Sequence, residues 1–420
     1  MRDIGSLTRL EGTIAAPPSK SVTQRALVAA SLARGVSTLR RPLLGGDGRI
    51  LVEALRRAGL QIDEQPEALT LDGSAGISSG PPLALHLGNA GTAMRFLAAR
   101  LATGERECVL DGDPRMRERP IEPLLAALRA LGARAASLQG NGCPPVAVGG
   151  LRPAGGEAHL DGTLSSQFLS GLLMAGPGFE NGVAITVEGA LVSRPYVDVT
   201  CDVMRHFGVE ATRFAVAPGS RYRPADITIE GDWSSASYFL AAAAIVPGRV
   251  EMQGLRSDSA QGDRRFADLL EEAGCRIERR ADGITATGTG TLQSLDADLG
   301  DCPDIAPTAA IVALFARGTT RLRGLAHLRL KESDRIAALC EGIAAIGGDA
   351  RPEADGLTIR PRPPHGGIVD PRGDHRMAFA FALLGLVVPG VLVRDPDCVA
   401  KSWSSFWSDL EGLGAVLVRA

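Results

Sequence analysis

The stretch PPSKSVTQRALVAA, residues 17–30, decides the fold, because it joins a small polar cluster to an apolar, alanine-rich run. The pattern recurs in LGNAGTAMRFL (87–97), SSQFL (165–169), SSASYFL (234–240), PDIAPTAAIVAL (303–314) and DHRMAF (374–379). The markers Ser21, Thr92, Ser166, Ser235, Thr308 and Met377 follow one another at steps of roughly 70 residues. Ser, Thr, Asp and Asn side chains cap helix N-termini, so we expect a helix to begin at each cluster.

A second series runs in phase with the first. Amphipathic runs end at Gly59, Gly132, Gly208, Gly274, Gly347 and Gly414, each followed by an extended stretch. Glycine just past a helix end adopts the left-handed conformation. The sequence therefore predicts an α/β fold of six units of about 70 residues, each with two helices and short strands such as 183–188 and 356–359. Several helix N-termini directed at one cavity would bind anions; well-capped buried helices explain the repeat equally well.

Composition narrows the function classes. The chain has 420 residues, of which 45% are hydrophobic and 22% charged, as in ordinary globular proteins. A formal charge of −3 and 4% aromatic residues argue against nucleic-acid and membrane partners. Seven cysteines without a C-x-x-C pair predict no metal centre and no disulfide framework. Neither a signal peptide nor a membrane span is expected, so we predict a cytoplasmic protein with reduced thiols.

Lysine is rare, and its positions are informative. Only Lys20, Lys331 and Lys401 occur, against 42 arginines (45 basic residues minus 3). Gene composition explains the excess of arginine, but all three lysines fall inside recurring motifs. An ammonium group is a compact charge that can release a proton, whereas guanidinium stays charged.

Further motifs carry polar and charged groups. DPRMRERP (113–120) places three arginines in five residues, which suits a clamp for carboxylate or phosphate but also an ordinary solvated loop. LSSQ (164–167) and SRPY (193–196) offer hydroxyl and amide donors. KESDR (331–335) adds charges of both signs and could equally form a buried ion-pair network. The glycine-rich LGNAGT (87–92) lacks the Gly-Lys-Ser/Thr ending of a nucleotide P-loop.

Taken in order, these motifs resemble those of the 5-enolpyruvylshikimate-3-phosphate (EPSP) synthase family over residues 17–401. The resemblance implies the two-domain enolpyruvyl transferase fold, with three βαβαββ units per domain and the active site in a cleft between the domains. Residues 18–230 would form the domain mainly on the shikimate 3-phosphate side. Residues 1–17 and 231–420 would form the domain mainly on the phosphoenolpyruvate (PEP) and proton-transfer side.

The resemblance also implies the reaction. The enolpyruvyl group of PEP passes to the 5-hydroxyl of shikimate 3-phosphate through a tetrahedral intermediate, releasing phosphate, in the shikimate pathway to chorismate and the aromatic amino acids. The family uses no metal and no cofactor, is usually monomeric, and is the target of glyphosate.

Site residues follow by resemblance. The catalytic residues would be Lys20, Asp304 (base for the hydroxyl), Glu332 (proton donor to the methylene) and Lys401. Shikimate 3-phosphate would bind Lys20, Ser21, Arg25, Ser165, Ser166, Gln167, Ser193, Tyr196, Asp304 and Lys331. PEP would bind Lys20, Gly91, Arg115, Gln167, Arg335, Arg376 and Lys401.

Three positions depart from the family pattern and leave their roles open. Asp47 lies in LGGDG (44–48), where relatives often carry Ser-Asp-Asp, and His327 replaces a substrate-contacting asparagine. Phe96 stands where several relatives have proline, which weakens the expectation of ordinary glyphosate sensitivity drawn from Gly91. The alternatives are a UDP-N-acetylglucosamine enolpyruvyl transferase, disfavoured because residues 113–120 contain no cysteine, an inactive anion-binding paralogue, and a transferase for a modified shikimate.

Overall fold

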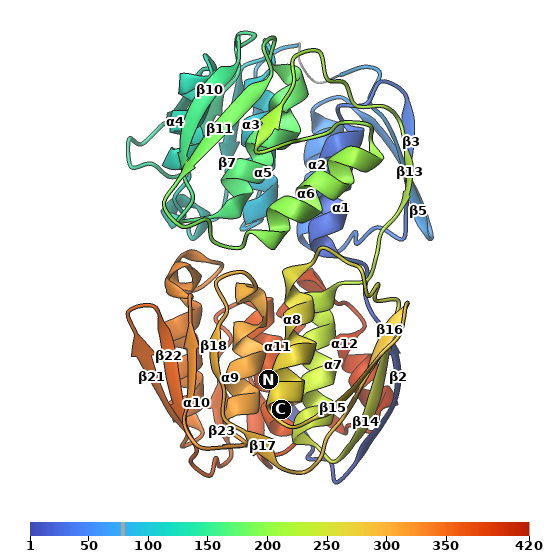
Figure 1. The fold of residues 1–420 in the computed structure, drawn as a ribbon, viewed down its shortest axis with the longest axis vertical. Coiled ribbons are helices and arrows are strands. Elements are labelled where there is room, and N and C mark those ends of the chain that lie inside the picture. The colour runs from blue at the N-terminus through green and yellow to red at the C-terminus, as the bar shows by residue number, and fades with distance from the viewer. Residues whose placement is uncertain (77–79, 420) are drawn as a thin grey trace. The chain divides into compact units, whose positions relative to one another are not determined.

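The computed structural model describes residues 1–76 and 80–419 (Figure 1). They form two compact units, which we call unit 1 (Met1–Pro17 with Glu230–Ala420) and unit 2 (Pro18–Ile229). The chain therefore passes from one unit to the other twice, after Pro17 and after Ile229.

Unit 2 contains three sheets within its described residues. Its strands are β3 (Val36–Arg40), β4 (Gln61–Gln65), β5 (Ala68–Asp72), β6 (Leu83–His86), β7 (Cys108–Asp111), β8 (Ala135–Ser137), β9 (Val146–Val148), β10 (Gly156–Asp161), β11 (Val183–Glu188), β12 (Ala215–Val216) and β13 (Asp226–Thr228). The strand orders are β13-β3-β5-β4, β6-β7-β9-β8 and β10-β11-β12. In each order the first pair is parallel and every later pair is antiparallel.

Unit 1 repeats this pattern. Its strands are β1 (Arg2–Ile4), β2 (Leu10–Ala15), β14 (Gly248–Gln253), β15 (Arg276–Arg279), β16 (Gly283–Thr287), β18 (Asp296–Asp298), β20 (Thr320–Arg323), β21 (Asp349–Glu353), β22 (Gly356–Arg360), β23 (Gly367–Val369), β24 (Val391–Val393) and β25 (Leu417–Arg419), with a small added pair β17 (Leu292–Gln293) and β19 (Ala316–Arg317). The orders are β2-β14-β16-β15, β18-β20-β22-β21 and β23-β24-β1-β25, again with a parallel first pair. Parallel neighbours need a crossover helix, which gives the βαβαββ unit. The predicted six-unit α/β fold is confirmed over the described residues.

The helices fall into two sets. The first is α1 (Lys20–Ala30), α3 (Gly91–Ala102), α5 (Ser166–Ala175), α7 (Trp233–Ile245), α9 (Ala306–Ala313) and α11 (His375–Gly385), and nearly all of its residues are buried. The second is α2 (Asp47–Arg57), α4 (Glu122–Ala130), α6 (Pro195–His206), α8 (Arg265–Glu272), α10 (Arg335–Ala345) and α12 (Phe406–Gly412), in which buried and exposed residues alternate at helical spacing. A helix that is apolar on all sides has to be surrounded by protein, as the helices of the first set are. An amphipathic helix, such as those of the second set, can pack its apolar face on the core and turn its polar face to solvent.

The helix ends test the sequence patterns residue by residue. The six glycines that follow the second set have φ between +79° and +110°, as predicted. Side-chain caps exist at Ser19, Ser165, Asp232 and Asp374.

Three helix starts differ from the cap prediction. Helix α7 begins at Trp233, so Ser234 and Ser235 lie in its first turn while Asp232 is the cap. Helix α3 follows Ala90 without a side-chain cap. Helix α9 continues from a 3₁₀ turn, η4 (Pro303–Ile305), because proline fits the first turn of a helix without needing a capped N–H group.

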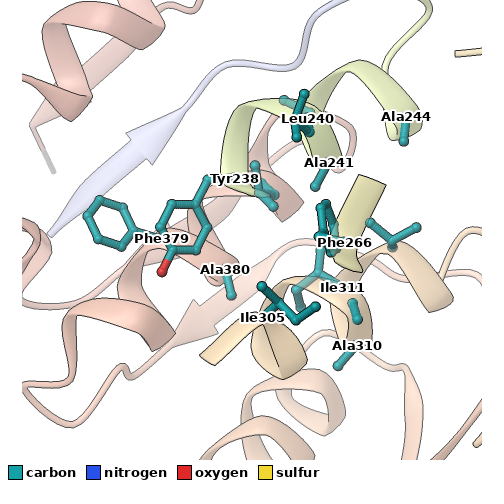
Figure 2. Close-up of a cluster of buried hydrophobic side chains, with 14 of the residues drawn as sticks. Tyr238, Leu240, Ala241, Ala244, Phe266, Ile305, Ala310, Ile311, Phe379 and Ala380 are labelled. Carbon is teal, nitrogen blue, oxygen red and sulfur yellow. The ribbon is translucent and has the colours of Figure 1, made fainter. Parts of the chain in front are cut away.

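The core of unit 1 is built on α7, α9 and α11. Figure 2 shows Leu240 and Ala241 of α7 close to Phe266 and Ile311. Alanine side chains allow these helices to approach closely, and aromatic rings fill the space that remains. Among the described residues, no helix is both long and apolar enough to cross a membrane.

Candidate active site

Arg335, the first residue of α10, is the centre of a charged cluster in unit 1. Its Nη1 donates to Asp304 Oδ1 at 2.9 Å, its Nη2 to Glu332 Oε2 at 2.8 Å, and its Nε to Asp374 Oδ2 at 2.8 Å. The side chain is 1% exposed. Burial lowers the pKa of this guanidinium, but the charges of Asp374, Glu332 and Asp304 outweigh burial and raise the pKa above its ordinary value. Arg335 is therefore a permanent cation among three carboxylates.

Arg376, in the first turn of α11, extends the cluster. Its Nη2 lies 2.7 Å from Asp304 Oδ2, so one carboxylate bridges two guanidinium groups. Asp374 caps α11 by accepting from the Arg376 N–H at 3.0 Å. The same carboxylate binds Arg335 and accepts from Ser333 Oγ at 3.1 Å. Asp374 thus holds the side chain of Arg335 and the backbone of Arg376 in place.

Lysine and histidine side chains adjoin the carboxylates. Lys401 ends the 3₁₀ turn η6 (Pro396–Lys401), and its Nζ lies 3.9 Å from Glu332 Oε1. His327, in the 3₁₀ turn η5 (Ala326–Leu330), is 5% exposed. Burial, then the charge of Lys331, lowers the pKa of His327 to about 3, although Asp304 acts in the opposite direction. The imidazole is therefore neutral near neutral pH.

Unit 2 places Lys20 at the start of α1. Ser19 Oγ caps this helix by accepting from the Val22 N–H at 3.4 Å. Lys20 Nζ lies 3.6 Å from Oδ2 of Asp47, the first residue of α2. Both side chains are largely buried, at 11% and 3% exposure. Asp47, whose role the sequence left open, is thus a counter-ion that holds the Lys20 ammonium group.

Arg25 is buried in the same helix. Its Nε donates to Thr200 Oγ1 at 2.7 Å, Nη1 to the Ser21 carbonyl at 3.0 Å, and Nη2 to the Tyr196 carbonyl at 3.1 Å. Burial lowers the pKa of Arg25 to about 10. No carboxylate of the described residues pairs with it; neutral hydrogen-bond partners and the rings of Phe96 and Tyr196, 5.1 and 5.8 Å from its Cζ, surround the charge instead. A buried cation of this kind favours an anionic ligand nearby.

Hydroxyl and amide groups gather at the starts of α5 and α6. Ser165 Oγ caps α5 by accepting from the Gln167 N–H at 3.2 Å, and Gln167 Nε2 donates to Thr92 Oγ1 of α3 at 3.1 Å. Ser166 follows the cap and is 3% exposed. Before α6, Ser193 is buried in a left-handed conformation with φ +55°. The first turns of α3 and α5 are therefore joined.

Gly91 lies against an arginine that the sequence analysis did not select. A Cβ atom at Gly91 would come within 2.4 Å of Arg119 Nη2 and 2.7 Å of Arg95 Nη1. Arg119 is 4% exposed, and its Nη1 donates to Asn89 Oδ1 at 2.9 Å. Arg115, which the sequence analysis assigned to PEP, is 32% exposed at its side chain and pairs with Glu118 at 2.9 Å.

The structure thus brings the predicted residues together within each unit. In unit 1 it joins Asp304, Glu332, Arg335, Arg376 and Lys401 through ion pairs. In unit 2 it links Ser21, Arg25 and Tyr196, and separately Gln167 with the first turn of α3.

Three residues were missed: Asp374, Arg119 and Tyr238, whose hydroxyl accepts from Arg376 Nη1 at 3.3 Å. All three lie in motifs quoted in the sequence analysis, and the cap position of Asp374 was a usable signal. Tyr238 stands in an apolar run and gave none.

Comparison with known proteins adds an independent line of evidence. The family model described as EPSP synthase (3-phosphoshikimate 1-carboxyvinyltransferase) matches residues 4–410. The chain belongs to this family. It is 42% identical over 411 residues to the 3-phosphoshikimate 1-carboxyvinyltransferase of Methanoculleus marisnigri, covering 96% of this chain and 97% of the relative. It is 40% identical to that of Vibrio campbellii, covering 97% and 98%.

Solved structures agree in fold. An EPSP synthase from Acinetobacter baumannii has a TM-score of 0.82 at 27% identity, covering 100% of this chain and 99% of that one. The enolpyruvyl transferase NikO from Streptomyces tendae has a TM-score of 0.79 at 20% identity, covering 100% and 98%, which shows the shared fold alone. Among the described residues, no group of three or more His, Cys, Asp or Glu side chains is arranged to hold a metal ion.

Proposed function

We propose that the chain transfers the enolpyruvyl group of PEP to the 5-hydroxyl of shikimate 3-phosphate, as a 3-phosphoshikimate 1-carboxyvinyltransferase. The observation that carries the assignment of roles is the unit 1 cluster, in which Asp304 and Glu332 share Arg335 and lie beside Arg376 and Lys401. It combines cations for a highly charged substrate with two carboxylates for proton transfer.

The cations bind PEP. In unit 1, Arg335, Arg376 and Lys401 bind its carboxylate and phosphate, because planar guanidinium groups form paired hydrogen bonds with both anions. In unit 2, PEP is bound by Lys20, Gln167 and the backbone of Gly91. We assign the unit 2 guanidinium to Arg119 rather than to Arg115, because Arg119 lies against Gly91 and Arg115 is engaged by Glu118.

Shikimate 3-phosphate binds mainly to the hydroxyl and amide side chains of unit 2. Ser21, Arg25, Ser165, Ser166, Gln167, Ser193 and Tyr196 bind it in unit 2, together with Lys20, and Asp304 and Lys331 hold ring hydroxyls in unit 1. The buried Arg25 charge supports this assignment, since no carboxylate of the described residues offsets it. An anion bound beside Arg25 would supply the missing charge.

The two carboxylates move protons. Asp304 takes the proton of the 5-hydroxyl while the oxygen of that hydroxyl bonds to C2 of PEP. Glu332 protonates C3, which becomes a methyl group. Lys401, 3.9 Å from Glu332, is the adjacent group that can supply that proton. In the second step the C–O bond to phosphate breaks, the phosphate leaves with the proton that Asp304 took from the hydroxyl, and the methyl group returns a proton to Glu332, so both carboxylates regain their starting states. The neighbouring cations offset the charge that develops on phosphate.

A phosphate-release assay with both substrates tests the proposal. The wild-type chain should release phosphate only when shikimate 3-phosphate and PEP are both present, and UDP-N-acetylglucosamine should not replace the first. Glu332→Gln should bind shikimate 3-phosphate normally in calorimetry but lose about 10²–10⁴-fold in kcat, as for a lost general acid. Lys20→Met should be inactive. Normal turnover of Glu332→Gln would remove Glu332 from the proton-transfer role.

A monomeric state, a cytoplasmic location and independence from metal ions belong to the same proposal. Sedimentation measurements test the first, and turnover after exhaustive chelation tests the last.

A further inference from the structure

Tyr238 is a buried tyrosine beside the charged cluster. It lies in α7, is 1% exposed, and its ring stacks on Phe379 of α11 with centroids 4.3 Å apart and an interplanar angle of 24°. Phe406 meets the Tyr238 ring edge-on at 6.4 Å. Figure 2 shows the Tyr238 and Phe379 rings side by side, with the hydroxyl oxygen at the end of the ring farthest from α7. The aromatic packing therefore fixes the position of the hydroxyl group.

The Tyr238 hydroxyl contacts the charged side chain of Arg376. Its oxygen accepts from Arg376 Nη1 at 3.3 Å, while Arg376 Nη2 binds Asp304 at 2.7 Å. Burial raises the pKa of Tyr238 above its ordinary value, and the Arg376 charge opposes the rise only in part. The hydroxyl thus stays protonated and acts on Arg376 as a neutral acceptor.

The two contacts hold the guanidinium at both of its terminal nitrogens. Asp304 is itself expected to change its hydrogen bonds during the reaction, because it accepts a proton from the substrate. An acceptor that does not react is then needed to keep the plane of Arg376 constant, since paired recognition of an anion depends on that plane.

We propose that Tyr238 is a positioning residue for PEP binding, acting through Arg376. The proposal rests on the assignment of Arg376 to PEP made above. Tyr238 itself contacts neither substrate. Its hydroxyl orients the guanidinium, and its ring, held by Phe379 and Phe406, makes that orientation rigid.

The variant Tyr238→Phe tests this directly because it keeps the ring and removes only the hydroxyl. We expect the KM for PEP to rise about 3- to 10-fold, less than the full effect of a lost hydrogen bond to a charged group, because the 3.3 Å contact acts on PEP only through Arg376. The KM for shikimate 3-phosphate should stay within twofold.

The matched control is Tyr222→Phe. This tyrosine is 5% exposed in unit 2, and its hydroxyl donates to the Met174 carbonyl at 3.0 Å. Its loss should lower the melting temperature without changing either KM. Equal KM changes in both variants would show that Tyr238 acts through general stability, which would overturn the proposal.

A double-mutant cycle separates this proposal from the function on which it rests. Arg376→Lys alone should raise the KM for PEP, and adding Tyr238→Phe should change it no further. An unchanged KM in Arg376→Lys would refute the assignment of Arg376, whereas additive effects would refute the role of Tyr238 only. If Tyr238→Phe fails to fold, Phe379→Leu, which keeps the hydroxyl but frees the ring, should raise the KM for PEP, and an unchanged KM there would count against the proposal.

Discussion

Replacing Gly91 by alanine gives a sharp test of the arrangement at α3. The new Cβ atom would lie 2.4 Å from Arg119 Nη2, 2.7 Å from Arg119 Cζ and 2.7 Å from Arg95 Nη1. Ordinary contacts begin at 3.4 Å, so Arg119 must move by about 1.0 Å (3.4 − 2.4). A shift of that size disturbs the 2.9 Å hydrogen bond from Arg119 Nη1 to Asn89 Oδ1.

The expected loss of PEP affinity follows from displacing Arg119 and weakening its hydrogen bond to Asn89. A hydrogen bond involving a charged group contributes about 1.5–3 kcal/mol, which corresponds to roughly 10- to 100-fold in affinity. If Arg119 binds PEP, the KM for PEP in Gly91→Ala should rise by this factor. Shikimate 3-phosphate affinity should hardly change, because Gly91 is assigned to PEP alone.

The assay is steady-state phosphate release with PEP varied at saturating shikimate 3-phosphate, with calorimetry for the binary complex. Gly412→Ala is the control, since a Cβ there meets nothing within 4 Å. On an Arg119→Ala background, Gly91→Ala should add little. A KM for PEP that stays within twofold of wild type would refute the steric reasoning, because the overlap at the new Cβ atom cannot be relieved without moving a guanidinium group.

Three further predictions concern the buried charges. Arg335→Met removes the buried cation that Asp304, Glu332 and Asp374 share, and it should lower the unfolding free energy by about 3–5 kcal/mol in urea denaturation. Arg351→Met, which breaks an exposed pair with Asp349, should cost at most about 1 kcal/mol. Similar losses in both variants would contradict the central role of Arg335 in the cluster. His327 has a pKa of about 3 when folded and about 6.5 when unfolded, so unfolding takes up a proton below pH 6.5. The unfolding free energy should therefore fall by up to about 1.4 kcal/mol per pH unit as the pH drops from 6.5 towards 3. In the His327→Asn variant the unfolding free energy should fall less steeply over the same range. Equal slopes in the variant and the wild type would show that the imidazole is not held neutral. Asp47→Asn should reduce kcat/KM about 10-fold by releasing Lys20, and wild-type kinetics would show that the 3.6 Å pair has no part in positioning it.

Much of the fold was predictable because its signals are local. The polar clusters and terminal glycines recur at a period of about 70 residues, and each reflects a backbone requirement satisfied within a few residues of the chain. Local reading was wrong where two signals competed. Asp232 rather than Ser234 caps α7, since only Asp232 precedes the first helical residue. The division of roles between the domains, and a cleft between them, stay predictions.

The motif order alone indicated the family, the reaction class and the residue types required, because a transferase that joins two anions needs arginine, lysine and paired acids in any fold. Only the tertiary structure decided which of them meet. It placed Arg119 against Gly91, made Asp374 the shared partner of Arg335 and α11, and placed the Tyr238 hydroxyl on Arg376, 138 residues away. Such contacts join segments far apart in sequence, so packing and side-chain rotamers set them, and no local pattern encodes them.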